Sequence, residues 1–227
     1  MDRQIIIVAG GQGRRMNAQQ PKQFLPLCGK PLLMRTMERF RDFDAEMPIT
    51  LVLPQQHFDT WKTLCHEYDF DIPHRVVAGG EERFFSVKNA LATIPDGVVV
   101  GIHDGVRPFA SDETIEQAFV HAETDGCAVP AMPAKESVRL ADGDTSAPLD
   151  RSKVMLVQTP QCFRSEIIKA AYDTDYSPLF TDDATVVETV LKKSIAITPG
   201  NAENIKITTP FDLEMAEIIY KNRQNEK

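Results

Sequence analysis

The chain has 227 residues, 42% of them hydrophobic and 26% charged, and its formal net charge at pH 7 is -8. This composition is ordinary for a soluble globular protein and excludes an intrinsically disordered one. The acidic balance argues against a nucleic-acid partner, because a nucleic-acid-binding surface needs a basic stripe that this sequence does not show. No Gly/Ser-rich or Pro-rich stretch divides the chain, so we expect one domain over residues 1–227.

The start of the chain carries no pattern of an export signal. Residues 1–4 are followed by an apolar run too short for a signal-peptide core, and no run reaches the roughly 18 apolar residues of a membrane-spanning helix. The 4 cysteines lie far apart and show neither C-x-x-C pairing nor zinc-ligand spacing with a histidine. We therefore expect a cytoplasmic protein with reduced, mostly buried thiols, no membrane contact and structural or surface histidines.

Short apolar runs rich in β-branched residues alternate with longer segments of helical periodicity. Strands are expected at residues 5–9, 49–53, 75–78, 98–102 and 127–131. Helices are expected at residues 32–43, 59–68, 86–94 and 114–124. This alternation predicts an α/β fold in which helices flank a mostly parallel sheet.

Two helix starts are well marked. Ser111 precedes a first turn that contains two acidic residues, which is typical of an N-cap. Thr209 is followed by proline at the first helical position and by Asp212, the acid of a capping box. A final helix over about residues 210–222 is therefore expected.

Residues 134–158, called the arm below, interrupt the alternation. Residues 137–140 and 154–158 alternate like strands around a polar turn at residues 141–144. The pattern predicts a β-arm inserted into the sheet, and spacing alone leaves open whether it is only a surface hairpin of the same subunit.

A glycine-rich loop follows the first expected strand. Residues 10–16 read Gly-Gly-Gln-Gly-Arg-Arg-Met, and glycines at such a place let the backbone approach a phosphate group. The dinucleotide fingerprint requires glycine or alanine where Met16 stands, and the P-loop pattern is also absent. Arg14, Arg15 and Lys22 add a local basic cluster to an acidic chain, although such side chains on a loop are often only solvated.

Two further loops follow apolar strands, whose carboxyl ends should meet at one sheet edge. Residues 79–86 contain a glycine pair, whose backbone groups can read a base edge, and Ser86, which can bind a base or a phosphate. Asp104 follows the strand at 98–102 and is well placed for Mg²⁺, which prefers one or two carboxylates plus substrate phosphates. The alternative is that Asp104 only caps a turn before Gly105.

Lys206 lies between two isoleucines in a short segment expected to be a strand. A lysine facing away from its apolar neighbours can be merely a solvated strand residue. The sequence pattern around Lys206 does not decide whether this lysine is a solvated strand residue or a substrate contact.

Taken together, these segments resemble the 2-C-methyl-D-erythritol 4-phosphate cytidylyltransferase family, from residue 5 to the final helix. Any one motif is weak, but their order along the chain is specific. The matching motifs are A-G-G-Q-G-R-R-M from Ala9, P-K-Q from Pro21, G-G-E-E-R-F-F-S-V from Gly79, H-D-G-V-R-P from His103, D-R from Asp150, Q-T-P-Q from Gln158, T-D-D-A from Thr181 and N-I-K-I-T from Asn204.

The resemblance implies a Rossmann-like nucleotidyltransferase sheet, the substrates CTP and a sugar-alcohol phosphate, and Mg²⁺. It implies Arg15 and Lys22 as transition-state stabilisers, and Arg151 and Lys206 as groups that position the acceptor phosphate. Asp104 is expected near the metal and the ribose. The nucleotide contacts it implies are Ala9, Gly10, Gly11, Gly13, Gly80, Ser86 and Asp104, with Gly80 and Ser86 at the cytosine end. The acceptor contacts it implies are Arg107, Ser137, Arg151, Thr159 and Lys206.

The resemblance also implies an assembly. In the family, the arm crosses a two-fold axis and contributes to the neighbouring active site, so Arg151 is expected to act in trans in a homodimer. The chain departs from the family pattern at Glu136-Ser137, where Asp-Thr is common, and at Phe84-Phe85, where smaller or polar residues are frequent. Ser137 keeps the hydroxyl, while the longer carboxylate of Glu136 alters the acceptor pocket.

Three other functions fit parts of the sequence. A ribitol 5-phosphate cytidylyltransferase would share the fold, the loop and the chemistry. A glycosyltransferase would use Asp-x-Asp, but the matches at residues 69–71, 142–144 and 173–175 do not follow apolar strands. An inactive nucleotide-binding module would not need both Arg15 and Lys22.

Overall fold

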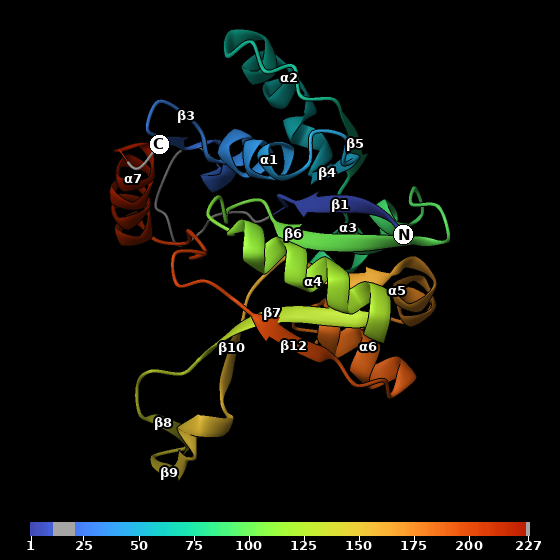
Figure 1. Cartoon of the computed structure of the whole chain (residues 1–227), viewed down its shortest axis with the longest axis vertical. Coiled ribbons are helices and arrows are strands. Elements are labelled where there is room, and N and C mark those ends of the chain that lie inside the picture. The colour runs from blue at the N-terminus through green and yellow to red at the C-terminus, as the bar shows by residue number, and fades with distance from the viewer. Residues whose placement is uncertain (11–20, 226–227) are drawn as a thin grey trace.

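The computed structural model describes residues 1–10 and 21–225 (Figure 1). Its centre is an 8-stranded sheet in the order β10-β7-β11-β6-β1-β4-β5, with β12 beside β7. The pairs β1·β4, β1·β6, β4·β5 and β7·β12 are parallel, whereas β11 and β10 run antiparallel to their neighbours. The prediction of a mostly parallel sheet flanked by helices is confirmed.

The strands of this sheet are short. They are β1 (Asp2–Val8), β4 (Ile49–Leu53), β5 (His74–Ala78), β6 (Val98–Asp104), β7 (Cys127–Pro133), β10 (Met155–Val157), β11 (Gln161–Arg164) and β12 (Ala196–Pro199). Smaller ladders join β2 (Pro26–Leu27) to β3 (Lys30–Pro31) and β8 (Val138–Asp142) to β9 (Thr145–Leu149).

The helices cover both faces of the sheet. They are α1 (Leu32–Phe43), α2 (Phe58–Glu67), α3 (Arg83–Leu91), α4 (Asp112–Asp125), α5 (Ser165–Tyr172), α6 (Asp183–Leu191) and α7 (Pro210–Asn225). Short 3-10 turns are η2 (Lys22–Phe24), η3 (Gln55–His57) and η4 (Arg151–Lys153).

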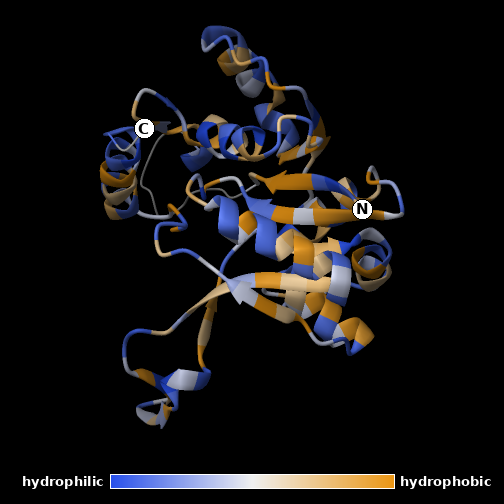
Figure 2. Cartoon of the chain, viewed as in Figure 1, coloured by the Kyte–Doolittle hydropathy of each residue, from blue (hydrophilic) through white to orange (hydrophobic). Residues whose placement is uncertain are grey.

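Alternation along β1 divides the core into two layers. Ile5 and Ile7 pack with side chains of α1, α2 and α4, whereas Ile6 packs with α3, α5 and α6. All three isoleucines are fully buried, as expected for a strand covered on both faces. Figure 2 shows hydrophobic residues running along β1 and β7 in the middle of the molecule. A third cluster around Leu27 and Phe109 holds α7 against one end of the sheet.

Both expected helix starts are confirmed. The Ser111 side chain accepts a hydrogen bond from the N–H of Thr114 at 3.1 Å. Thr209 and Asp212 form a reciprocal pair: the N–H of Thr209 donates to Asp212 Oδ2 at 2.8 Å, and the N–H of Asp212 donates to Thr209 Oγ1 at 3.2 Å. These bonds satisfy N–H groups that a helix start leaves without an intrahelical acceptor.

Three details of the expected elements are wrong. Residues 154–158 do not pair within the arm; β10 pairs with β7, and the hairpin partner of β8 is β9 instead. Lys206 lies outside any strand, although the N–H of Ile207 donates to Val106 O at 3.1 Å. Helix α3 begins at Arg83 rather than Ser86.

The thiols agree with the expected reduced state of the cysteines. All 4 cysteines are free; Cys127 and Cys162 are buried, and Cys28 and Cys65 are half-buried. Burial raises the pKa of the Cys65 thiol to about 11. Among residues 1–10 and 21–225, no helix has the length and apolar character needed to span a membrane.

Candidate active site

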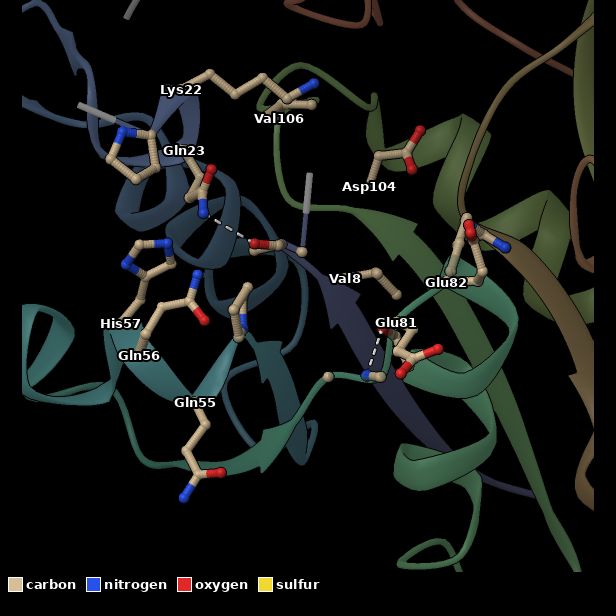
Figure 3. A pocket seen from close by; sticks show the side chains of 18 of the residues that line it. Val8, Lys22, Gln23, Gln55, Gln56, His57, Glu81, Glu82, Asp104 and Val106 are labelled. Atoms are coloured by element: carbon tan, nitrogen blue, oxygen red, sulfur yellow. Dashed lines mark hydrogen bonds between the residues drawn. The ribbon is translucent and has the colours of Figure 1, made fainter. Parts of the chain in front are cut away.

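The predicted site residues of the sheet edge surround one cavity of about 940 Å³ (Figure 3). Its walls come from the carboxyl ends of β1, β4, β5 and β6, from η2, and from Lys206. This confirms that the loops after these strands share an edge, where ligands of open α/β sheets bind. The lining side chains are contributed by residues 8–10, 21–23, 54–57, 79–83, 86, 104, 106 and 206.

The exit of β1 is held from two sides. The N–H of Ala9 donates to Val52 O at 2.9 Å, and the buried Gln23 donates through Nε2 to Ala9 O at 3.0 Å. Lys22 precedes Gln23 and lines the cavity, as Figure 3 shows. Gln23 was not expected as a site residue, although it belongs to the P-K-Q motif.

Part of the expected phosphate loop lies outside the described residues. This applies to Gly11, Gly13 and Arg15, whose roles remain predictions. Gly10, the last described residue before the gap, lines the cavity, and a Cβ built on it would lie 3.8 Å from Ser86 Oγ.

The turn after β5 is tightly built. The N–H of Gly79 donates to Leu53 O at 2.8 Å, and the N–H of Gly80 donates to Ser86 Oγ at 3.0 Å. A Cβ on Gly80 would lie 2.4 Å from the Cβ of Phe85, closer than any side chain allows. Both glycine N–H groups, which were expected to face a base, are thus engaged within the protein.

Asp104 ends β6 and meets two cations at the cavity wall. Its Oδ2 lies 3.0 Å from Lys206 Nζ and 3.2 Å from Arg107 Nε. Burial alone would raise the pKa of the Asp104 carboxyl, but Lys206, Arg83 and Arg107 outweigh it and hold the pKa well below its usual range. Asp104 is therefore an anion near neutral pH, and three expected site residues are brought together here.

A buried hydrogen-bond network holds the backbone of Asp104. Its N–H donates to Thr159 Oγ1 at 3.2 Å, and this hydroxyl lies 2.9 Å from His103 Nδ1. His103 Nε2 lies 2.8 Å from Arg107 O, an atom that can only accept, so Nε2 carries the proton. Burial lowers the pKa of His103 to about 4, which makes the ring neutral near pH 7. The structural role expected for His103 is confirmed, whereas Thr159, expected to contact the acceptor, is itself buried in this network.

Residues 200–208 reach the site through side-chain bonds rather than through a strand. Arg107 Nη1 donates to Asn204 O at 2.7 Å, and Asn204 Nδ2 donates to Thr159 O at 2.9 Å. Asn204 is two residues from Lys206, so these bonds help to hold Lys206 beside Asp104. The sequence carried this signal in the N-I-K-I-T motif, but no role was expected for Asn204.

The expected site residues of the arm are not part of this cavity. Arg151 is exposed on η4 and donates through Nη1 to Lys135 O at 2.8 Å. Ser137 and the neighbouring Glu136 are also exposed, at the start of the arm. The structure thus separates Arg151 and Ser137 from Lys22 and leaves their expected roles untested.

Asp104 is the cavity residue that we expected to hold a metal, and Glu81 and Glu82 also line the cavity. Among residues 1–10 and 21–225, no group of three or more His, Cys, Asp or Glu side chains could hold a metal ion. Mg²⁺ is often held by one or two carboxylates together with substrate phosphates and water. The ionised carboxylate of Asp104 on the cavity wall fits that arrangement.

The comparison with known families decides the relationship of the chain. The model of the 2-C-methyl-D-erythritol 4-phosphate cytidylyltransferase family matches residues 4–222. The chain belongs to this family. The resemblance found in the sequence motifs is therefore confirmed, and with it the nucleotidyltransferase type of the fold.

Individual members of the family agree along nearly their whole length. The 2-C-methyl-D-erythritol 4-phosphate cytidylyltransferase of Bacteroides fragilis is 49% identical over 219 residues, which cover 96% of this chain and 100% of that protein. The protein of the same name from Porphyromonas gingivalis is 50% identical over 218 residues, 96% of this chain and 97% of that protein. The crystal structure of the Thermus thermophilus cytidylyltransferase superposes with a TM-score of 0.78 at 28% identity and covers 97% of this chain and 100% of its own.

Proposed function

We propose that the protein transfers a cytidylyl group from CTP to 2-C-methyl-D-erythritol 4-phosphate. The products would be 4-diphosphocytidyl-2-C-methyl-D-erythritol and pyrophosphate, in the non-mevalonate isoprenoid pathway. The observation that carries this proposal is the meeting of Lys22, Lys206 and Asp104 in one cavity of a cytidylyltransferase fold. The high identity to relatives that carry this name favours methylerythritol phosphate over ribitol phosphate as the acceptor.

The reaction requires charge neutralisation more than a base. The second pKa of a phosphate monoester is about 6, so the acceptor is already largely dianionic near pH 7. The main obstacle is repulsion between this anion and the α-phosphate of CTP, together with the charge that develops on the leaving pyrophosphate. Lys22 and Arg15 would stabilise that charge, while Lys206 and Arg151 would align the acceptor for in-line attack.

The family resemblance implies an end of the cavity for each part of the nucleotide. Gly80 and Ser86 would hold the cytosine end, and the ribose would lie near Asp104. The phosphates would extend toward Lys22 and the loop that begins at Gly10. A bound Mg²⁺ at Asp104 would neutralise phosphate charge.

The arm suggests how the site is completed. Arg151 is exposed and is not among the residues that line the cavity of its own chain, which supports a homodimer in which it serves the neighbouring site. We further propose that this dimer is cytoplasmic, since its substrates are soluble phosphates.

A pyrophosphate-release assay tests the function. CTP, UTP and ATP are each combined with 2-C-methyl-D-erythritol 4-phosphate and with ribitol 5-phosphate. We expect release only with CTP and the methylerythritol phosphate. Faster release with ribitol phosphate would assign the other acceptor. In a separate assay, turnover of an added sugar nucleotide with release of its nucleotide and no pyrophosphate would indicate a glycosyltransferase.

A further inference from the structure

Arg83 lines the cavity, where its positive charge helps to keep Asp104 ionised, but no contact with a substrate has been assigned to it. It is the first residue of α3, and its guanidinium binds the carboxylate of Asp183 through two parallel bonds. Nη1 donates to Oδ1 at 2.8 Å, and Nη2 donates to Oδ2 at 2.6 Å. The Asp183 side chain is 0% exposed and the Arg83 side chain 31%, so the pair joins the interior to the cavity wall. This two-bond geometry fixes the direction of the arginine as well as its distance.

The carboxylate of Asp183 is itself fixed. Tyr172 donates through its hydroxyl to Asp183 Oδ1 at 2.6 Å. Asp183 opens α6, and the preceding Asp182 caps that helix by accepting from the N–H of Thr185 at 2.8 Å. Gln161 on β11 then donates to Asp182 Oδ2 at 2.8 Å. The anchor of Arg83 is therefore tied to the central sheet.

Aromatic contacts of Phe84 also attach the start of α3 to the rest of the protein. The ring of Phe84 stacks on Tyr172, with centroids 4.7 Å apart and planes at 16°. It also stacks on Phe180 at 5.6 Å and 24°. Such aromatic contacts stabilise beyond the area they bury. The Phe84 departure from the family pattern thus strengthens the attachment of the start of α3.

Hydrogen bonds connect the helix start at Arg83 to the turn at residues 79–82, which directly precedes it, so a displacement of Arg83 would also displace this turn. The N–H of Ser86 donates to Glu82 O at 3.1 Å, and Ser86 Oγ accepts from the N–H of Gly80 at 3.0 Å. Gly80 already lies against Phe85 with no room for a Cβ. The turn therefore has little freedom to adjust independently of the residues around Arg83.

We propose that Arg83 is a positioning residue for nucleotide binding, which holds Gly80 and Ser86 in place through its paired bonds to Asp183. This inference rests on the proposed function, because it assigns these two residues to the cytosine end. Arg83 acts on the nucleotide through the turn, so its loss weakens the binding of CTP more than it slows the chemical step.

The test uses Arg83→Lys, which keeps the charge but loses the two-bond fork. Affinity for CTP is measured by calorimetry without acceptor, and kcat and both KM values by pyrophosphate release. We expect the Kd and the KM for CTP to rise about tenfold or more, since small displacements of binding groups have effects of this order. The kcat at saturating CTP and the KM of the acceptor should change by less than about threefold.

The control is Arg3→Lys. Arg3 also binds a carboxylate through two bonds, to Glu116 at 2.7 and 3.1 Å, but lies outside the cavity lining. CTP affinity should remain normal in this variant. If Arg83→Lys does not fold, the double variant Arg83→Gln/Asp183→Asn replaces it, since it leaves no unpaired charge in the interior. It too should weaken CTP binding about tenfold or more.

The outcomes separate the two proposals. Wild-type protein that binds no CTP overturns the proposed function. Wild-type protein that binds CTP, with an Arg83→Lys variant that binds it equally well, overturns the positioning role alone. A lower kcat with an unchanged Kd for CTP also overturns it.

Discussion

The cavity edge and the arm are held together by different means. At the cavity, Asp104 ends a fully buried strand and contacts Lys206 from a distant segment. On the arm, β8 pairs with β9, and Arg151 contacts the carbonyl of Lys135, another arm residue. Leu140 and Leu149 on this hairpin are 61% and 43% exposed.

This difference underlies our proposal that the arm, and not the cavity, depends on a partner. The cavity residues are ordered by the core of their own chain. The hairpin pairs Val138 with Leu149 and Leu140 with Ala147, which places these apolar side chains on one face of a two-stranded ladder. An isolated ladder of this kind is marginally stable in water, so its apolar face needs a covering surface. A second copy of the chain is the covering surface that we propose.

The largest effect is expected at the cavity edge. Lys22→Ala and Arg15→Ala should each lower turnover by roughly 10² to 10³, the effect of losing one transition-state charge donor, while the protein remains folded. Pyrophosphate release at saturating CTP and Mg²⁺ measures this. Lys30→Ala is the control, because Lys30 pairs with Glu38 outside the cavity lining. Near-normal turnover in either site variant would remove that residue from the chemistry.

The arm is tested by mixing subunits. Lys22→Ala and Arg151→Ala chains are unfolded together and refolded, so that half of the dimers are mixed. If Arg151 acts in trans, each mixed dimer has one intact site, and about a quarter of wild-type activity should return. If Arg151 serves its own subunit, every site lacks one group. Mixtures with confirmed heterodimers but no regained activity would make the arm a surface hairpin.

The smallest effect is expected for the metal. Asp104→Asn removes a hard anionic ligand while nearly keeping the shape, so the Mg²⁺ concentration for half-maximal activity should rise about tenfold. A Mg²⁺ titration of pyrophosphate release measures this. Asp112→Asn, at an exposed helix start, should leave the titration unchanged. An unchanged titration for Asp104→Asn with a lower Tm would favour the turn-capping role.

The sequence predicted the elements whose signals are local. The bounds of α1 and β4 agree to the residue, because helical periodicity marks the one and a short apolar run marks the other. Helix α3 begins three residues before the expected start, and its first residue, Arg83, binds Asp183, which is far away in sequence. Helix α6 was not predicted, although Asp182 followed by Thr185 carried a usable capping signal.

The arm and the site show the limit of pattern reading. Residues 154–158 were correctly expected to be strand-like, since β10 pairs with β7, but strand-like character does not specify which strand is the partner. The strand expected around Lys206 failed because Ile207 and Asn204 bond to single groups and not to a ladder. The loops of the cavity after β1, β5 and β6 were predictable, since they follow apolar runs that form strands of the sheet. The supporting roles of Gln23 and Thr159 were not predictable from the sequence, because they depend on hydrogen bonds to residues that are adjacent only in the folded chain.

The contact between Lys206 and Asp104 has a consequence for how ions affect the enzyme. If Lys206 receives the acceptor phosphate as proposed, the incoming anion finds a lysine that already has a counter-ion 3.0 Å away. Binding of the acceptor then gives Lys206 a phosphate in place of Asp104 as its counter-ion, so no uncompensated charge on Lys206 is neutralised. Added salt screens uncompensated charges most strongly, so acceptor affinity should depend less on ionic strength than the number of cations in the site suggests.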